Sequence, residues 1–321
     1  MANRTDNAQQ LVAGIDVGKQ ALDVSVCGGA VRRFGNDAGG VEELVAWLES
    51  EGVRLAVCES TGGYERLLVA RLRAGSIGLH VAHPTKVRSF ARASGQGAKT
   101  DRLDAQVLAR YGEVFDLPVV SAQAGESLAL RELLGRRQQL MGQRVQESNR
   151  LEKGLAGALK RSCERHMAWL DKEIARMDKQ YQTQLERDEA LQAQVTLYQS
   201  VQGVGTLTAA TLVAWLPELG QCQGKALTAL VGLAPWACDS GRQHGYRAIR
   251  GGRGTVRRAL YMAALSAIRC NADLRRFYQG LRRRGKPGKV AVTAVMRKLL
   301  LQLNAVARRG TPWVEHYEAA V

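Results

Sequence analysis

The chain has 321 residues and a formal net charge of +16 at neutral pH, so it is long enough for two domains and a sizeable core. A hydrophobic fraction of 45% excludes a disordered chain. No run of about 18 or more uncharged apolar residues occurs, which predicts that no helix spans a membrane. The N-terminus lacks the apolar core of a secretory signal, and the six cysteines form no C-x-x-C pair, so we expect a cytoplasmic protein.

After a flexible start at residues 1–9, residues 10–122 predict an α/β domain. Apolar runs predict strands at residues 11–17, 21–27, 31–35, 54–58 and 79–82. Two amphipathic stretches predict helices at residues 41–50 and 64–74. Their expected buried residues are Val41, Leu44, Val45 and Leu48 in the first, and Leu67, Leu68 and Leu72 in the second. Thr100 is the expected N-cap of a further helix that contains Val107 and Leu108.

Four acidic residues stand out in this domain. Asp16 and Glu59 each end an apolar run, and Asp101 and Asp104 open a helical stretch three residues apart, on one helix face. A carboxylate at the end of a buried strand is costly to desolvate without a partner, so the set predicts a shared metal site that acts on phosphate. Mg²⁺, as one ion or as two ions about 3.5–4 Å apart, suits carboxylate ligands.

Each of the four acids also has a structural alternative. Asp16 could cap a turn, Glu59 could pair with Arg66, and the two helical acids could simply favour a helix N-terminus. All three alternatives together are a less economical account of the pattern than one shared site.

Residues 123–196 are rich in Gln, Glu, Arg and Leu and contain no proline, which predicts long helices in a hairpin or coiled coil. The apolar stripes expected along them are Leu151, Leu155 and Leu159, and Ile174, Met177, Tyr181 and Leu185. The segment is either a helical spacer or an oligomerisation arm.

Residues 197–310 predict a mostly α-helical C-terminal domain, followed by a tail at 311–321. Gly203 and Gly205 have the spacing of a helix–hairpin–helix turn that contacts DNA phosphate, although an ordinary interhelical turn has the same spacing. Residues 240–310 carry 18 Lys and Arg against one acid, Asp273. This basic block favours a nucleic-acid partner over a merely solvated face.

The opening Gly14-Ile-Asp-Val-Gly-Lys with its hairpin resembles the ribonuclease-H-like fold of the RuvC type. Actin-like ATPases begin similarly, but the second phosphate loop and the large second domain that they need are missing. The chain as a whole, from about residue 10 to 310, resembles the DEDD-type transposases of the insertion sequence 110 family. The matching motifs are Glu59-Ser-Thr-Gly-Gly-Tyr, Lys99-Thr-Asp-Arg-Leu-Asp-Ala, Val201-Gln-Gly-Val-Gly, Gly232-Leu-Ala-Pro, Ser240-Gly, Gly251-Gly-Arg and Arg257-Arg-Ala-Leu-Tyr-Met.

This resemblance implies a bacterial transposase that excises and inserts an insertion sequence through a covalent 5′-phosphoserine intermediate. Ser240 is the nucleophile by match to the Ser-Gly motif, and Asp16, Glu59, Asp101 and Asp104 bind Mg²⁺ in a composite site. The implied partners are element-end DNA, target DNA and a structured guide RNA. A homodimer or homotetramer is expected, because recombination brings several strands together. Candidate phosphate contacts are Arg242, Arg250, Arg253 and Arg257.

Two other functions fit the same residues. A metal-dependent endonuclease or junction resolvase of the RuvC type would cut DNA with water and leave Ser240 structural. A non-enzymatic scaffold would use the basic block alone, with all four acids structural. A covalent protein–DNA product separates the transposase from both alternatives.

Overall fold

In a computed structural model the described residues are 11–96, 101–117, 119, 128–236 and 248–314, and of residues 101 and 102 only the backbone is described. The chain folds as two compact units, Met1–Gly125 and Glu126–Val321. Thr100, the expected N-cap, lies outside the described residues.

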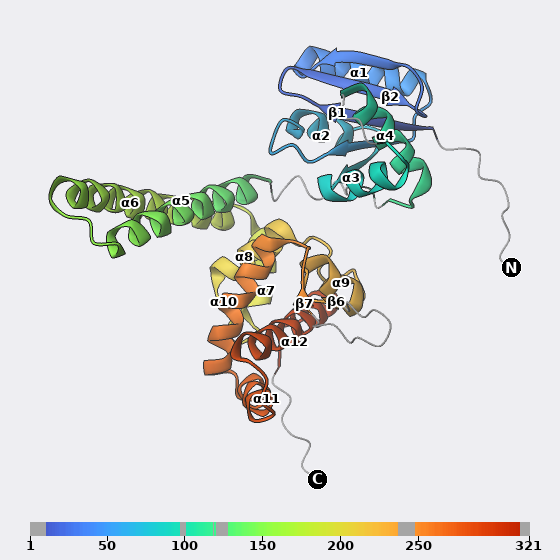
Figure 1. The fold of residues 1–321 in the computed structure, drawn as a ribbon. Coiled ribbons are helices and arrows are strands. Elements are labelled where there is room, and N and C mark those ends of the chain that lie inside the picture. Colours follow the sequence, from blue (N-terminus) through green and yellow to red (C-terminus); the bar gives the residue numbers. More distant parts are fainter. Residues whose placement is uncertain (1–10, 97–100, 118, 120–127, 237–247, 315–321) are drawn as a thin grey trace, which may run out of the picture. The chain divides into compact units, whose positions relative to one another are not determined.

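A five-stranded mixed sheet forms the centre of the N-terminal unit, in the order β3-β2-β1-β4-β5 (Figure 1). Strands β1, β2 and β3 form an antiparallel meander, while β4 and β5 run parallel to β1. Their bounds are β1 Val12–Val17, β2 Ala21–Val26, β3 Val31–Gly35, β4 Leu55–Glu59 and β5 Gly78–Ala82. This topology is compatible with the ribonuclease-H-like fold that the sequence predicts.

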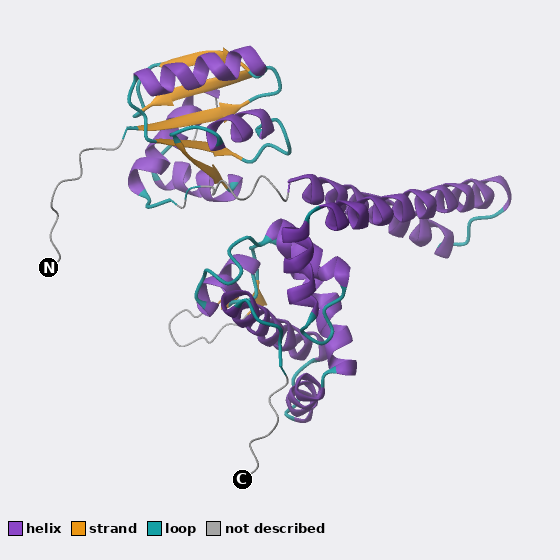
Figure 2. Cartoon of the chain, turned by 180° about the vertical axis from the view of Figure 1, so that it is seen from behind, coloured by secondary structure: helices purple, strands orange, loops and turns teal. Residues whose placement is uncertain are grey.

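Helices cover both faces of this sheet. The helices α1 (Ala38–Ser50) and α2 (Arg66–Arg73) pack on one face, with α1 in front in Figure 2. The helices α3 (Pro84–Ala93) and α4 (Asp101–Val114) pack on the other. Because side chains alternate along a strand, each strand supplies one apolar set to each face. In β1, Ala13, Ile15 and Val17 face α1, and Val12 faces α4.

The predicted stripe of α1 is confirmed, since its four apolar residues are all buried. In α2 the prediction for Leu67 is wrong. Leu67 is 41% exposed, because Leu68 and Leu72, one helical turn apart, occupy the buried side of this short helix. The helix α3 is not among the predicted elements; it begins with a proline at its first turn and buries only Val87, so its apolar pattern is weak.

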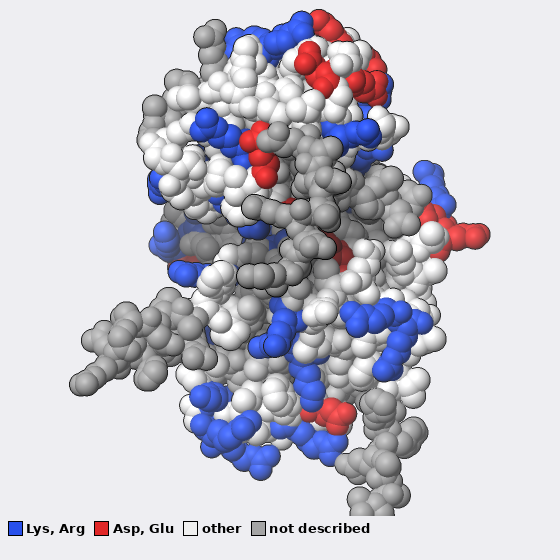
Figure 3. All heavy atoms as spheres, turned by 90° about the vertical axis from the view of Figure 1, so that its right-hand side faces the viewer, with Lys and Arg blue, Asp and Glu red and all other residues white. Residues whose placement is uncertain are grey.

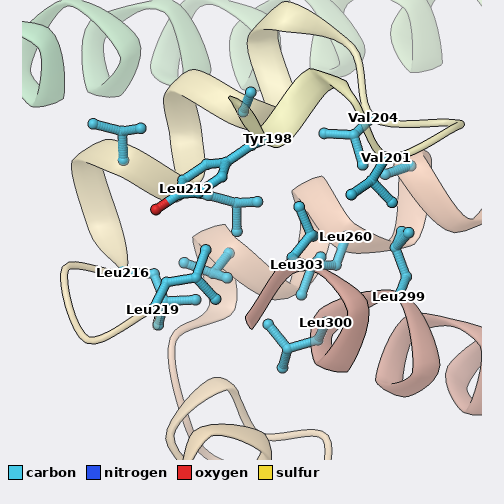
Figure 4. Packing of buried hydrophobic residues seen from close by; sticks show 14 of the residues in the cluster. Tyr198, Val201, Val204, Leu212, Leu216, Leu219, Leu260, Leu299, Leu300 and Leu303 are labelled. Carbon is cyan, nitrogen blue, oxygen red and sulfur yellow. The ribbon is translucent and has the colours of Figure 1, made fainter. Parts of the chain in front are cut away.

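The C-terminal unit is helical apart from a two-stranded sheet of β6 (Pro235–Trp236) and β7 (Ala248–Ile249). Its helices are α5 Leu128–Glu152, α6 Gly157–Arg187, α7 Glu189–Gln199, α8 Thr206–Trp215, α9 Gly224–Val231, α10 Gly254–Cys270, α11 Ala272–Arg283 and α12 Gly288–Arg309. Figure 4 shows α7, α8, α10 and α12 contributing Tyr198, Leu212, Leu260 and Leu303 to one apolar core. A fully buried leucine of this kind contributes about 1.5–3 kcal/mol to folding.

Among the described residues α12 alone is long and apolar enough to cross a membrane by length and composition. Half of that apolar segment is buried within the protein, and Val295, Leu299 and Leu303 lie in the C-terminal core. We therefore interpret α12 as the core helix of this unit.

The helices α5 and α6 form an antiparallel hairpin with a regular register. Arg137 pairs with Asp178, Arg144 with Asp171, and Glu147 with His166, so the partner number falls as the first number rises. The predicted stripe from Ile174 to Leu185 on α6 is buried, as expected.

The stripe expected on the other arm of this hairpin is wrong. The helix α5 ends at Glu152, Gly154 has positive φ in the turn that follows, and Gly157, also with positive φ, is the first residue of α6. Leu155 therefore lies in the turn, and Leu159, at the start of α6, is 66% exposed. The base of the hairpin joins the core of the C-terminal unit through Leu130, Leu134, Tyr181 and Leu185.

Candidate active site

Asp16 lies on the face of the sheet that α4 covers. It is two residues beyond Gly14, and a Cβ on Gly14 would meet the Ala105 carbonyl oxygen at 2.1 Å and the Ala109 nitrogen at 2.2 Å. Only glycine allows so close an approach of helix to strand. Since alternate residues of a strand share a face, Asp16 points to the α4 side at the carboxyl end of β1.

Glu59 stands beside Asp16. The parallel register pairs Ile15 with Cys58, so Asp16 and Glu59 are the next residues on adjacent strands. Leu55 and Val57 pack with α4, which places Glu59 on the same face by alternation. Cys58 faces the opposite side, and burial raises the pKa of its thiol to about 12, which makes it a poor nucleophile.

The first turn of α4 carries Asp101 and Asp104 toward this edge. Gly112, near the end of α4, lies against Val12, whereas Ala105 and Leu108 lie against Gly14, so α4 runs antiparallel to β1. Extending that path by one turn brings the start of α4 to the carboxyl end of β1, where Asp16 lies. The Asp104 side chain is half-buried; the Asp101 side chain is outside the described set.

Two residues that sequence reasoning missed shape the loops around these acids. The Asn36 amide donates to the Gly18 carbonyl at 2.8 Å and to the Tyr64 carbonyl at 3.0 Å, which joins the loop after β1 to the loop after β4. The Glu65 carboxylate accepts from the Thr61 hydroxyl at 2.8 Å and from the Gly63 backbone N–H at 2.8 Å.

The pKa of Glu65 reflects this role. Burial raises it, but hydrogen bonds from its own backbone N–H, from Thr61 and from Gly63 outweigh burial and lower the pKa below its usual value. The Glu65 carboxylate is therefore ionised at neutral pH, and its hydrogen bonds hold the glycine loop that follows Glu59.

A cleft of about 400 Å³ opens beside Asp16. It is lined by Asp16, Gly18, Lys19, Gln20, Ala21, Asp23 and Arg33. Among the side chains that the structure describes, no three from His, Cys, Asp and Glu lie close enough together to hold a metal ion. The donor set nevertheless suits Mg²⁺, because Asp16 and Glu59 are half-exposed carboxylates on adjacent strands, and carboxylate oxygens are the hard ligands that Mg²⁺ prefers. The shared metal site thus stays a prediction.

Ser240 and Arg242 lie outside the described residues, which stop at Trp236 and resume at Ala248. The two ends of that segment are joined by β6 and β7, where Pro235 pairs with Ile249. Arg250 follows β7 and lies over the Trp236 ring, 5.2 Å from its centre.

The glycine motifs around β6 and β7 pack against each other rather than against open space. Gly232 and Gly252 both have positive φ, and a Cβ on Gly252 would meet the Gly232 nitrogen at 2.2 Å. The Arg257 guanidinium donates to the Gly251 carbonyl and, at 3.3 Å, to the Val231 carbonyl. These two hydrogen bonds give Arg257 a structural role in the turn.

Arg253 and Gly203 also have structural roles. The Arg253 guanidinium forms a two-pronged ion pair with Glu218 and donates to the Trp215 carbonyl at 2.8 Å. A Cβ on Gly203 would lie 2.5 Å from Ala267 of α10, so this glycine permits helix packing. Neither contact supports the predicted role in phosphate binding. Gly205 lies in open space before α8, and its contact with phosphate stays a prediction.

Seven exposed basic side chains of the C-terminal unit lie close together in the sequence, on α11, in the turn that follows it and at the start of α12, and Lys and Arg are shown in blue in Figure 3. They are Arg275, Arg276, Arg282, Arg283, Arg284, Lys286 and Lys289. The charge count of residues 240–310 indicated such a surface, but it did not separate these residues from Arg253, which is held in an ion pair with Glu218.

Two family models match the chain. One is the DEDD-type transposase model of IS110, described as "Transposase", over residues 13–159. The other is described as "Transposase IS116/IS110/IS902 family" and matches residues 195–279. Together they include the sheet and α4 of the N-terminal unit and most of the C-terminal core.

Curated relatives agree with these matches. The pilin gene-inverting protein of Moraxella bovis is 25% identical over 311 residues, covering 94% of this chain and 96% of its own. Its counterpart in Moraxella lacunata matches equally well. An uncharacterized 43.6 kDa protein of insertion element IS110 from Streptomyces coelicolor is 32% identical over 124 residues, 38% of this chain and 31% of the relative. The chain belongs to the IS110 family of DNA transposases.

Proposed function

We propose that the protein cuts and rejoins DNA at the ends of an insertion sequence through a 5′-phosphoserine intermediate on Ser240. The observation that carries the metal-dependent half is the placement of Asp16 and Glu59 side by side at the carboxyl ends of β1 and β4. The first turn of α4, with Asp101 and Asp104, extends toward the same edge. The serine half rests on the match to the family's Ser-Gly motif.

In the proposed reaction the Ser240 hydroxyl attacks the scissile phosphorus and loses its proton to a basic group of the site. A serine Oγ–P bond forms, the P–O3′ bond breaks, and the departing 3′-oxygen takes up a proton. A second 3′-hydroxyl then attacks the phosphoserine and restores both a phosphodiester and the free serine. The number of P–O bonds is conserved, so rejoining needs no ATP.

Asp16, Glu59, Asp101 and Asp104 are the residues that would hold Mg²⁺, which when bound supplies Lewis-acid stabilisation of phosphoryl charge. Serine is a weak nucleophile at its free pKa, so a site of this kind also serves to activate it. We further propose a structured guide RNA, a homodimeric or homotetrameric assembly, and action in the bacterial cytoplasm. The name of the Moraxella relatives, which describes inversion of a gene, supports DNA rearrangement as the outcome.

The metal-dependent half is tested by Asp16→Asn and Glu59→Gln, with Glu43→Gln on the exposed side of α1 as the control. Strand cutting of element-end DNA with guide RNA is measured beside direct Mn²⁺ binding by electron paramagnetic resonance. Both signals should fall by about 100-fold or more in the two site variants and persist in the control. Wild-type cutting by Asp16→Asn would overturn the proposal.

A further inference from the structure

A row of four charged residues crosses the sheet at the level of Asp16. The antiparallel register pairs Asp16 with Asp23 on β2, and Asp23 in turn with Arg33 on β3. Glu59 continues the row on the other side of Asp16. All four therefore occupy the face that α4 covers, and Arg33, Asp23 and Asp16 line the same cleft.

Asp23 is the more buried residue of the ion pair that it forms with Arg33. Its side chain is 9% exposed, whereas that of Arg33 is 64% exposed. The guanidinium meets the carboxylate in a fork, with Nε to Oδ1 at 2.9 Å and Nη2 to Oδ2 at 2.7 Å. Two-pronged pairs of this kind fix the orientation of an arginine as well as its position.

The pairing of Arg33 with Asp23 offsets the repulsion between the neighbouring carboxylates of Asp16 and Asp23. Directly opposed residues on antiparallel strands have Cβ atoms about 4.5–5.5 Å apart, and like charges there repel each other. A buried carboxylate beside Asp16 would be unfavourable without a cation, and Arg33 supplies it. An ion pair that served only to stabilise the surface would not need its acid, Asp23, to be buried next to the candidate metal ligand Asp16.

The pair also brings a positive group into an acidic cleft. Both Asp23 oxygens accept from Arg33, so Asp23 is better suited to anchoring than to binding metal. The anchored guanidinium lies in a cleft that carries Asp16 and remains accessible to solvent. A phosphate that approaches Asp16 in this cleft would meet Arg33.

We propose that Arg33 contacts a phosphate of the bound DNA beside Asp16, and that Asp23 is the positioning residue that holds Arg33 there. This inference rests on the proposed function, because it assigns the cleft to the DNA strand being cut. No resemblance or motif match assigns a role to either residue.

The test compares Arg33→Met with Arg32→Met in the full-length chain. Arg32 is the ideal control, because it is the adjacent exposed arginine on the opposite face of β3, 4.9 Å from the centre of the Trp47 ring. Affinity for element-end duplex DNA is measured as a function of salt in a Ser240→Ala background, and cutting is measured with Ser240 present. Mn²⁺ binding reports on the carboxylates independently of activity.

Arg33→Met should weaken DNA binding about tenfold and lower the salt slope by about 1, the value for one lost phosphate contact. Cutting should fall about 100-fold, while Mn²⁺ binding stays intact. Arg33→Lys should keep the salt slope but recover only part of the cutting rate, since lysine carries the charge without the fork. Arg32→Met should behave as wild type.

The double variant Asp23→Asn/Arg33→Met removes the unpaired buried acid, so it remains informative if Arg33→Met alone folds poorly. It should bind DNA no worse than Arg33→Met, because Asp23 acts through Arg33. Equal defects in the Arg32 and Arg33 variants, or additive losses in the double variant, would overturn the inference. The proposed function fails separately, if Asp16→Asn leaves both Mn²⁺ binding and cutting unchanged.

Discussion

At the residue scale, the site depends on side chains that form hydrogen bonds with residues far away in the sequence. Asn36 is the clearest case, because one amide joins the Gly18 and Tyr64 loops that flank Asp16 and Glu59. Nothing in the local pattern around Asn36 predicts this role. A single polar residue shows its long-range partners only once the strands are paired.

Asn36→Ala should therefore reduce DNA cutting more than it reduces stability. Two neutral hydrogen bonds contribute about 0.5–1.5 kcal/mol each, whereas displaced catalytic loops can cost about tenfold or more in rate. Cutting rate and thermal unfolding are measured together, with Asn149→Ala on the exposed side of α5 as the control. A full cutting rate in Asn36→Ala would show that the loops hold without it.

Gly14 gives a sharper prediction about packing. In Gly14→Ala the added Cβ meets backbone atoms of α4, which cannot rotate away, so the variant should lose about 3 kcal/mol or more of stability. Gly142→Ala on the exposed side of α5 has no atom within 4 Å of its new Cβ and should gain about 0.5–1 kcal/mol. Urea unfolding measures both. A neutral Gly14→Ala would mean that α4 does not lie this close to β1.

At the element scale, apolar residues that repeat with the helical period predicted which side of a helix is buried. The α1 stripe and the Ile174–Leu185 stripe of α6 repeat with the helical period and are buried. The stripe through Leu155 and Leu159 has the same spacing but crosses the break between α5 and α6, where Gly154 and Gly157 have positive φ. Apolar spacing predicts a helix only where the backbone between the residues permits one.

The candidate site divides in the same way. The strand-end positions of Asp16 and Glu59 followed from apolar runs, and the sheet places them on adjacent strands. The contacts of Arg253 and Arg257 within the protein could not be predicted, because a basic count does not distinguish an arginine paired with Glu218 from one facing solvent. Ser240 was identified by family motif alone and lies outside the described residues.

The α5–α6 hairpin makes a pH prediction through Glu147. Hydrogen bonding from His166, partly opposed by burial and aided by Cys163 and Arg150, lowers the pKa of Glu147 below its ordinary value of 4.5. A lowered folded-state pKa contributes stability above the unfolded value, and that contribution is lost as pH falls through the folded value. The hairpin should therefore weaken below about pH 4.5.

Thermal unfolding from pH 7 to pH 3 tests this prediction, with Glu147→Gln beside wild type. The stability difference between the two proteins should be largest near neutral pH and shrink as pH falls below about 4.5. Glu152→Gln, at the end of α5, is the control for loss of a carboxylate in the same helix. A difference that grew in acid would contradict the assigned role of Glu147.

At the scale of the whole molecule, the two compact units carry different parts of the proposed chemistry. The N-terminal unit holds the carboxylates and the Asp23–Arg33 pair, and the C-terminal unit holds the Ser240 segment between β6 and β7. Exposed basic residues gather on α11 of the C-terminal unit, as expected for a protein whose partner is DNA.

The covalent serine intermediate is the central claim, and a denaturing gel tests it most directly. The protein is incubated with Mg²⁺, labelled element-end DNA and the flanking RNA, beside Ser240→Ala and the control Ser266→Ala on the exposed side of α10. The account predicts a labelled protein–DNA band that survives denaturation in wild type and Ser266→Ala and is absent in Ser240→Ala. Cut DNA without any such band would contradict it and indicate attack by water.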